Sequence, residues 1–100
     1  MDDSQLLSMF NGKNVLITGG TGSLGQALTS KLLKSKVNQI RIFSRNELKQ
    51  IEMEEKFHDR RLRFFIGDVR DLARLELALE DADYVFHAAA LKHVPKVEYN

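Results

Sequence analysis

The fold is decided by residues 14–25, which read NVLITGGTGSLG. The first five, 14–18, form a short apolar and β-branched run that is typical of a buried strand. Four of the six glycines follow directly, between residues 19 and 25. Over residues 23–36 the apolar positions recur at helical spacing, which predicts one face of a helix made by Leu24, Leu28 and Leu32, with Ala27 beside them.

The same alternation continues along the rest of the chain. Residues 5–10 could make one amphipathic turn before it starts. Strands are predicted at 39–44, 63–67 and 84–88, and helices at 47–57 and 71–79, the second with Asp71 as its N-cap. The apolar positions of these helices are Leu48, Ile51 and Phe57 in the first and Leu72, Leu75 and Leu79 in the second. The alternation predicts an α/β fold, a doubly wound parallel sheet of about four strands with helices on both faces and strand order 3-2-1-4.

Composition limits the class of protein. The chain has 100 residues, with 15 Lys and Arg against 14 Asp and Glu. This balance is too even for a typical nucleic-acid binder, and the basic residues of 60–63 and of the 31–36 segment are better explained as a solvated surface. The sequence has no cysteine, which excludes disulfides, cysteine zinc sites and thiol catalysis. No His, Asp and Glu grouping has metal-ligand spacing, so no metal is predicted.

Targeting signals are not evident either. No apolar run is long enough to span a membrane. The first residues, MDDS, are acidic and lack the basic-then-apolar order of a secretory signal. We therefore expect a cytoplasmic protein without a membrane partner.

The glycine cluster fits two overlapping patterns. Gly20, Gly22 and Gly25 match the dinucleotide fingerprint GxGxxG, and Gly19, Gly22 and Gly25 match its short-chain dehydrogenase variant. Such glycines permit a tight turn, a close approach of the backbone to a pyrophosphate and close helix–sheet packing. The helix that follows offers free N–H groups to the anion. A Rossmann-type nucleotide site is therefore favoured over a purely structural turn, and the absence of Gly-Lys-Ser/Thr excludes a Walker A loop.

The end of the second predicted strand indicates which dinucleotide binds. NAD enzymes place an acidic residue there to bind the ribose hydroxyls, but this chain has Ser44, Arg45 and Asn46. A guanidinium suits a 2′-phosphate, and Lys49 can add a second cation one turn later. The sequence favours NADP; the alternative is that Arg45 only belongs to a solvated loop.

Later strand ends supply further candidates. Asp68 can accept from the adenine amino group beside Val69, or can only organise its turn. Ala88, Ala89 and Ala90 would let a flat cofactor lie close to the backbone, and Lys92 and His93 follow where nicotinamide and substrate should meet. His93 is a possible proton shuttle, although a lone histidine is more often structural. His87 is expected in the core and His58 has no specific role.

Four stretches together resemble the extended short-chain dehydrogenases of polysaccharide biosynthesis. They are TGGTGSLG (18–25), SRNELK (44–49), GDVRD (67–71) and AAALKHVP (88–95), and the resemblance runs from residue 11 to residue 100. It is greatest to the inverting 4,6-dehydratase branch that acts on UDP-N-acetylglucosamine. The resemblance implies a cofactor site made by Gly19, Thr21, Gly22, Ser23, Leu24, Gly25, Ser44, Arg45, Lys49, Asp68, Val69, Ala88, Ala89, Ala90 and Lys92.

The resemblance also implies an activity. In this branch, tightly held NADP takes hydride from C4 of the sugar and returns it to C6, water is lost, and C5 is inverted. The substrate is the small molecule UDP-N-acetylglucosamine, the product enters pseudaminic acid synthesis for flagellin glycosylation, and the enzyme is expected to be a homo-oligomer.

The catalytic residues of the branch have no match here. They include a Tyr-x-x-x-Lys pair, and neither Tyr84 nor Tyr99 is followed by lysine at the fourth position. We therefore expect residues 1–100 to be the amino-terminal, NADP-binding portion of a longer enzyme, without its substrate domain and inactive alone. The alternatives are a related UDP-sugar epimerase or reductase of capsular polysaccharide synthesis and a non-catalytic NADP-binding module.

Overall fold

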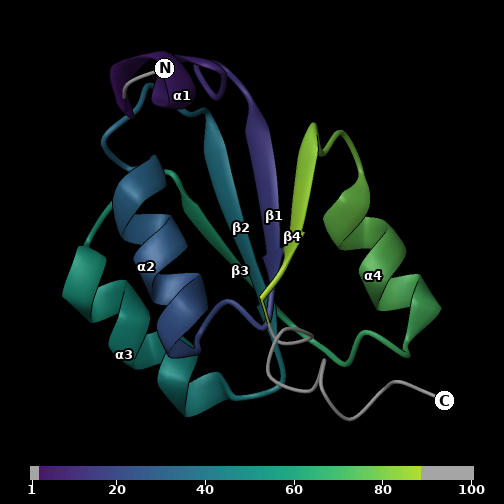
Figure 1. Ribbon diagram of the computed structural model, residues 1–100. Helices are drawn as coiled ribbons and strands as arrows, with labels where there is room; N and C mark the ends of the chain where they lie inside the picture. Colours follow the sequence, from purple (N-terminus) through teal and green to yellow (C-terminus); the bar gives the residue numbers. More distant parts are fainter. Residues whose placement is uncertain (1–2, 89–100) are drawn as a thin grey trace, which may run out of the picture.

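Four parallel strands form the centre of the molecule, and the computed structural model describes residues 3–88 (Figure 1). β1 (Asn14–Thr18) lies between β2 (Gln39–Ser44) and β4 (Tyr84–His87), and β3 (Leu62–Ile66) lies outside β2. The order β3-β2-β1-β4 confirms the order predicted from right-handed crossovers. Because every strand runs the same way, the loops that follow them meet at one edge, the lower one in Figure 1.

The helices cover both faces of the sheet, as predicted. α2 (Ser23–Leu32) and α3 (Glu47–Phe57) lie on one face and α4 (Leu72–Leu79) on the other (Figure 1). α1 (Asp3–Ser8) sits at the amino-terminal edge, and Phe10 just after it packs edge-on against Tyr84 with ring centroids 5.0 Å apart. None of the helices within residues 3–88 combines the length and the apolar character that a bilayer crossing requires.

The larger core lies beneath α2 and α3. Four of its nine buried residues come from alternate positions of β1 and β2, which point to the same face of the sheet: Val15, Ile17, Ile40 and Ile42. The others are Leu32, Val37, Met53, Leu62 and Ala88. A smaller cluster of Leu16, Phe43 and Ala78 lies beneath α4. Burial on both faces explains why β1 reads as a continuous apolar run.

A buried arginine fixes α4 to the sheet. Arg41 points to the α4 face of β2 and is 8% exposed. Its guanidinium donates to the carbonyl oxygens of Ala78, at 2.9 Å, and Glu80. Carbonyl groups at a helix C-terminus lack intrahelical partners, so a cation there satisfies them and interacts favourably with the helix dipole. The apolar pattern of β2 does not predict this role.

Element boundaries differ from the predictions at four places. The helix predicted over 23–36 ends at Leu32, because the Ser35 hydroxyl donates to the Leu32 carbonyl (2.6 Å) and closes a turn. The third strand is 62–66, one residue earlier than predicted, since Gly67 already begins the next loop. The fourth ends at His87, although the Ala88 amide still donates to Thr18 (2.9 Å). At the start of the chain, the helix is 3–8 where a turn over 5–10 was expected.

Several apolar residues that the spacing placed on helix core faces are exposed: Leu24, Ala27, Leu48, Ile51, Leu72 and Leu79. The buried helix positions are Gly25, Thr29, Gln50, Met53 and Ala78, together with Leu32. Leu28, Phe57 and Leu75 do pack against the core clusters. Only a narrow strip of each helix touches the sheet. In α2 and α4 this strip includes the small residues Gly25 and Ala78, whereas in α3 it consists of Gln50 and Met53.

Candidate cofactor site

The loops after β1, β2 and β3 border an open cavity of about 820 Å³ at the carboxyl edge of the sheet. In open α/β sheets this edge is where ligands bind. Eight of the residues predicted for the cofactor lie in its lining: Gly19, Thr21, Gly22, Ser44, Arg45, Lys49, Asp68 and Val69. The structure therefore gathers side chains from three separate parts of the sequence around one space.

The turn after β1 leaves a helix end open to this space. Gly19 has a φ of +67°, in the left-handed region that favours glycine, and its amide donates to the Phe43 carbonyl at 2.8 Å. Gly22 is the N-cap of α2, and no side chain in the described part of the chain caps it. Because the first turn of α2 also contains no acidic residue, its N–H groups and its dipole favour a bound anion.

Close packing explains the other two glycines of the motif. A Cβ on Gly25 would lie 2.4 Å from the Gly20 carbonyl oxygen and 2.5 Å from the Gly20 Cα. A Cβ on Gly20 would lie 2.8 Å from Cγ2 of Ile42. Gly25 itself is buried and does not line the cavity. Its contact with Gly20 holds the start of α2 against the turn, which aims the helix end at the cavity.

The end of β2 is held by a residue that the sequence analysis did not single out. The Gln50 side chain, 4% exposed, donates from Nε2 to the Ser44 hydroxyl (3.0 Å) and to the Phe65 carbonyl (2.9 Å). Asn46 caps α3 by accepting from the Lys49 amide at 3.0 Å. These bonds tie α3 to the ends of β2 and β3. The sequence pattern does not predict this role, because Gln50 is a polar residue in a helix whose apolar positions were expected to face the core.

Replacing Gln50 with alanine should destabilise the protein by about 1–3 kcal/mol, because the Phe65 carbonyl would lose its side-chain partner in a largely buried place. Urea unfolding measures this change. Glu55→Ala, at an exposed position of the same helix, is the matched control and should change the free energy of unfolding by less than about 0.5 kcal/mol. Equal losses in the two variants would show that Gln50 has no special part.

Two cations border the cavity near the end of β2. The Arg45 side chain is 76% exposed, and its Nη1 lies 3.5 Å from Oδ2 of Asp68 in the loop after β3. Lys49 also lines the cavity and is exposed. No acidic residue occupies the position after Ser44, where a ribose diol would be bound. The chemistry at this point suits a phosphate group.

Asp68 is the centre of an ion-pair group. Arg70 donates to it from Nη2 (2.8 Å) and Nε (3.1 Å), and the Arg70 backbone amide donates at 2.9 Å. These hydrogen bonds, more than the Arg45 charge, hold the pKa of Asp68 well below its usual range. Arg70 lines the cavity but was not among the predicted residues. Its basic character was visible in the sequence, whereas its pairing with Asp68 was not.

His87 differs from its expected place in the core. It is exposed at the end of β4, and its Nδ1 lies 2.9 Å from Oγ1 of Thr18. The prediction of a core histidine is wrong because the side chains of β4 alternate, and Tyr84 and Phe86 take the inward positions. The contact joins the ends of β1 and β4 beside the glycine turn.

The remaining predicted residues fall in three groups. Ser23 borders a neighbouring groove shared with Thr21 and Lys49, and Leu24 is exposed in the first turn of α2. Ala88 is buried directly after β4. The other predicted positions lie outside the described residues 3–88 and are Ala89, Ala90, Lys92 and His93.

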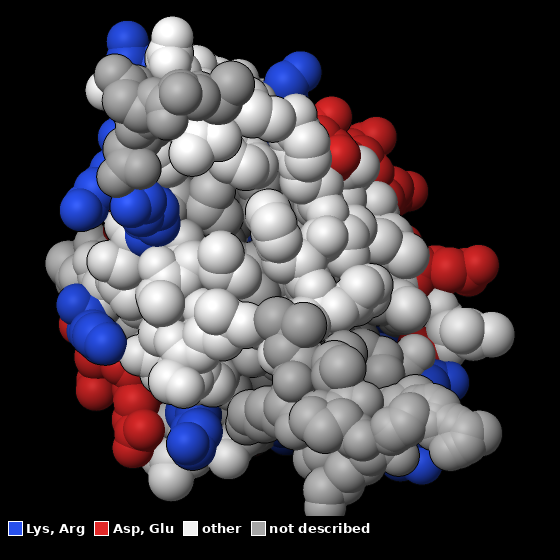
Figure 2. All heavy atoms as spheres, viewed as in Figure 1, with Lys and Arg blue, Asp and Glu red and all other residues white. Residues whose placement is uncertain are grey.

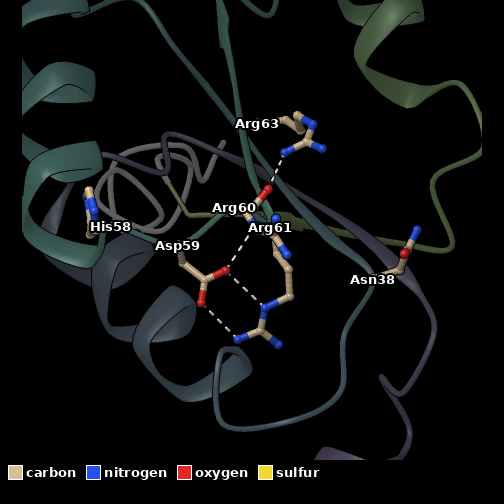
Figure 3. Close-up of a pocket in the computed structure, with 6 residues that line it drawn as sticks. All are labelled: Asn38, His58, Asp59, Arg60, Arg61 and Arg63. Carbon is tan, nitrogen blue, oxygen red and sulfur yellow. Dashed lines mark hydrogen bonds and ion pairs between the residues drawn. The ribbon is translucent and has the colours of Figure 1, made fainter.

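The basic tract 60–63 lies at the opposite, amino-terminal edge, around a second cavity of about 650 Å³ (Figure 3). Arg61 points at Asp59, with Nη2 2.9 Å from Oδ2, and also donates to the carbonyls of Leu33 and Ser35 after α2. Arg63 is turned away from it, toward the Arg60 carbonyl. Arg61 therefore connects the segment before β3 to the segment after α2. His58 lines the same cavity.

The charge distribution on the face drawn in Figure 2 is mixed. Basic side chains on the side of α2 and α3 are separated by neutral and acidic ones, and acidic side chains gather on the side of α4 (Figure 2). This face therefore has no continuous basic area, in keeping with the near-balanced composition.

Comparison with known proteins places these features in a family. A family described as polysaccharide biosynthesis protein matches residues 15–100. UDP-N-acetylglucosamine 4,6-dehydratase (inverting) of Campylobacter jejuni is 60% identical over 93 residues, which cover 92% of this chain and 28% of that protein. A UDP-glucose 4-epimerase of Rickettsia bellii is 50% identical over 95 residues, covering 91% of this chain and 28% of the epimerase. The chain thus spans 28% of the length of these curated relatives.

Solved structures share the fold. Pen from Bacillus thuringiensis is 48% identical with a TM-score of 0.78, over 85% of this chain and 26% of that one. Two others are each 27% identical with a TM-score of 0.64. A Veillonella parvula short-chain dehydrogenase/reductase in complex with NADP matches over 75% of this chain and 34% of that one. WbmF of Bordetella bronchiseptica in complex with NAD+ matches over 80% of this chain and 24% of WbmF.

The fold and the glycine turn are those of the Rossmann-type short-chain dehydrogenases and reductases. Within that class, the chain belongs to the polysaccharide biosynthesis protein family.

Proposed function

We propose that residues 1–100 form the NADP-binding portion of a nucleotide-sugar 4,6-dehydratase that acts on UDP-N-acetylglucosamine and inverts C5. The observation that carries the cofactor assignment is the set of cations at the end of β2 and β3, which lies where an NAD site has an acidic residue. The 60% identity to the Campylobacter enzyme supports the reaction.

The residues present fit NADP by their chemistry. The uncapped start of α2, behind Gly22, suits the pyrophosphate. Arg45 and Lys49 suit the 2′-phosphate, since a guanidinium offers paired donors to a phosphate. Asp68 and Val69, which also line the cavity, suit the adenine. Open, glycine-lined backbone between these groups leaves room for the ribose.

In the proposed reaction, bound NADP supplies reversible hydride transfer, so that the sugar loses water without net oxidation. The described part of this chain contributes binding and orientation: the α2 end and the cations fix the phosphates and thereby the rest of the cofactor. We assign this role to the fifteen residues that the resemblance implies, including those outside the described range. The proposal also includes a lyase classification, a cytoplasmic location and a homo-oligomeric enzyme.

The second candidate is a UDP-sugar epimerase or reductase, supported by 50% identity to the Rickettsia epimerase. Epimerases share the hydride transfer at C4 but release no water. A non-catalytic NADP-binding module is the third. The three differ in what happens to the sugar.

Proton NMR of UDP-N-acetylglucosamine incubated with the protein expressed from its complete reading frame distinguishes these candidates. A 4,6-dehydratase generates a C6 methyl signal, because hydride returns to C6 after water leaves. An epimerase would change the C4 proton coupling without a methyl signal, and a binding module would change nothing.

The 100-residue polypeptide alone should give no methyl signal, because its sequence contains no Tyr-x-x-x-Lys pair. The same NMR assay, with the complete protein as positive control, checks this. Turnover by residues 1–100 would contradict our assignment of these residues to cofactor binding alone.

A further inference from the structure

The Asp68 carboxylate accepts three hydrogen bonds from Arg70 and forms an ion pair with Arg45. Oδ1 accepts from the Arg70 amide (2.9 Å) and from Arg70 Nε (3.1 Å). Oδ2 accepts from Arg70 Nη2 (2.8 Å) and faces Arg45 Nη1 at 3.5 Å. A carboxylate has about four lone-pair positions. Three of these positions accept hydrogen bonds from Arg70, so an adenine amino group that approaches the fourth competes with the Arg45 guanidinium.

The partner that can leave at least cost is Arg45. Its contact is the longest of the four, and its side chain is 76% exposed. Asp68 is its only ion-pair partner within residues 3–88. Arg70, by contrast, holds Asp68 with two side-chain nitrogens and its own backbone amide, all within one short turn. The hydrogen bonds between Arg70 and Asp68 are therefore the stronger contact. The Arg45–Asp68 ion pair is the weaker contact, which a ligand can exchange.

We propose that Arg70 is a positioning residue for cofactor selection: it clamps Asp68, and binding of NADP exchanges the Arg45–Asp68 ion pair for an Arg45–phosphate and an Asp68–adenine contact. This inference rests on the proposed NADP site. This exchange makes recognition of the adenine and of the 2′-phosphate cooperative. When Arg45 binds the phosphate, Asp68 becomes available to adenine, and when Asp68 binds adenine, Arg45 becomes available to the phosphate. NAD+ has no 2′-phosphate and gains only one of these two contacts.

Removing the clamp should therefore act through Arg45. In an Arg70→Ala variant, Oδ1 and Oδ2 lose their close partners and become available to the Arg45 guanidinium. Arg45 is then held by Asp68 more strongly and must be released before it can bind a phosphate. NADP+ affinity should fall about fivefold, the size expected for an exposed ion pair. NAD+ affinity should fall less, because the adenine contact is the only one that NAD+ gains when Arg45 is released.

The test is a double-mutant cycle by calorimetric titration of NADP+ and NAD+ into wild type, Arg45→Ala, Arg70→Ala and the double variant. Arg70→Ala should weaken NADP+ about fivefold in the wild-type background but about twofold or less when Arg45 is already alanine. Arg70→Lys keeps the charge but not the forked donors, and should behave like Arg70→Ala. Equal losses in both backgrounds, or full rescue by lysine, would overturn the inference and make Arg70 a direct phosphate ligand.

Two further measurements distinguish a failure of this inference from a failure of the proposed function. Carbon NMR of the Asp68 carboxyl in the cofactor-free protein should show its pKa rising toward the ordinary 3.8 in Arg70→Ala, with an unchanged melting temperature. A large drop in melting temperature with equal losses for both cofactors would make Arg70 merely structural and overturn the inference. If the wild type binds neither cofactor or prefers NAD+, the proposed function fails; if it prefers NADP+ and Arg70→Ala has no effect, only this inference fails.

Discussion

Replacing Gly25 with alanine is expected to destabilise the fold by about 3 kcal/mol or more and to abolish cofactor binding. The new Cβ would lie 2.4 Å from the Gly20 carbonyl oxygen, and the atoms it meets belong to the backbone, which cannot rotate away. Relief requires α2 to move away from the glycine turn, and that movement also removes the helix end from the cavity. Urea unfolding and NADP+ titration measure the two effects.

The control for this variant is Ser30→Ala, an exposed position on the same helix. It introduces the same residue without a clash and should change the free energy of unfolding by less than about 0.5 kcal/mol. If Gly25→Ala were as stable as this control, the close contact between Gly20 and Gly25 would not be what fixes α2.

Replacing Arg45 with alanine is expected to reduce NADP+ affinity by about 10- to 100-fold, the value of a hydrogen-bonded charge contact, and to leave NAD+ affinity unchanged or slightly higher. The asymmetry arises because only NADP+ carries the 2′-phosphate, and because loss of Arg45 frees one lone pair of Asp68. Calorimetric titration of both cofactors gives the ratio directly.

Arg60→Ala provides the matched control, since it removes the same exposed side chain at the opposite edge of the sheet. Neither affinity should change by more than about twofold, as expected for a surface charge far from the ligand. Equal loss of NADP+ and NAD+ affinity in Arg45→Ala would contradict the role given to Arg45.

The strands and their order were predictable because local and global signals agreed. The run 14–18 is apolar throughout, as a strand covered on both faces must be, and the glycines after it mark where the chain turns into a helix. The predicted bounds of β1, β2 and α3 match the structure. Right-handed crossovers then allow few topologies, and the structure has the favoured one.

The side-chain contacts were much less predictable. Spacing alone placed Leu48 and Ile51 against the core, yet Gln50 is buried because its amide satisfies groups at the ends of two strands. The partners of Arg41 are likewise brought close only by folding, at positions 78 and 80. Hydrophobic periodicity describes how a helix meets an apolar surface, and it carries no information about which backbone carbonyls need a donor.

The candidate site was likewise predictable in its residues but not in their contacts. Gly19, Gly22, Arg45, Lys49 and Asp68 could be identified one by one from their places after the predicted strands, and the structure gathers them around one cavity. Arg70 could not, because its importance comes from two side-chain hydrogen bonds to Asp68. Asp68 itself was expected either to accept from adenine or to organise its turn.

The most direct test of the central claim, that this chain carries an NADP site at the carboxyl edge of its sheet, is calorimetric titration of the unmodified protein with NADP+ and with NAD+ under the same conditions. We predict one NADP+ bound per chain, at least about tenfold more tightly than NAD+, the difference expected for a charged contact to the 2′-phosphate. Binding of neither cofactor, or NAD+ affinity equal to or higher than NADP+ affinity, would contradict the account.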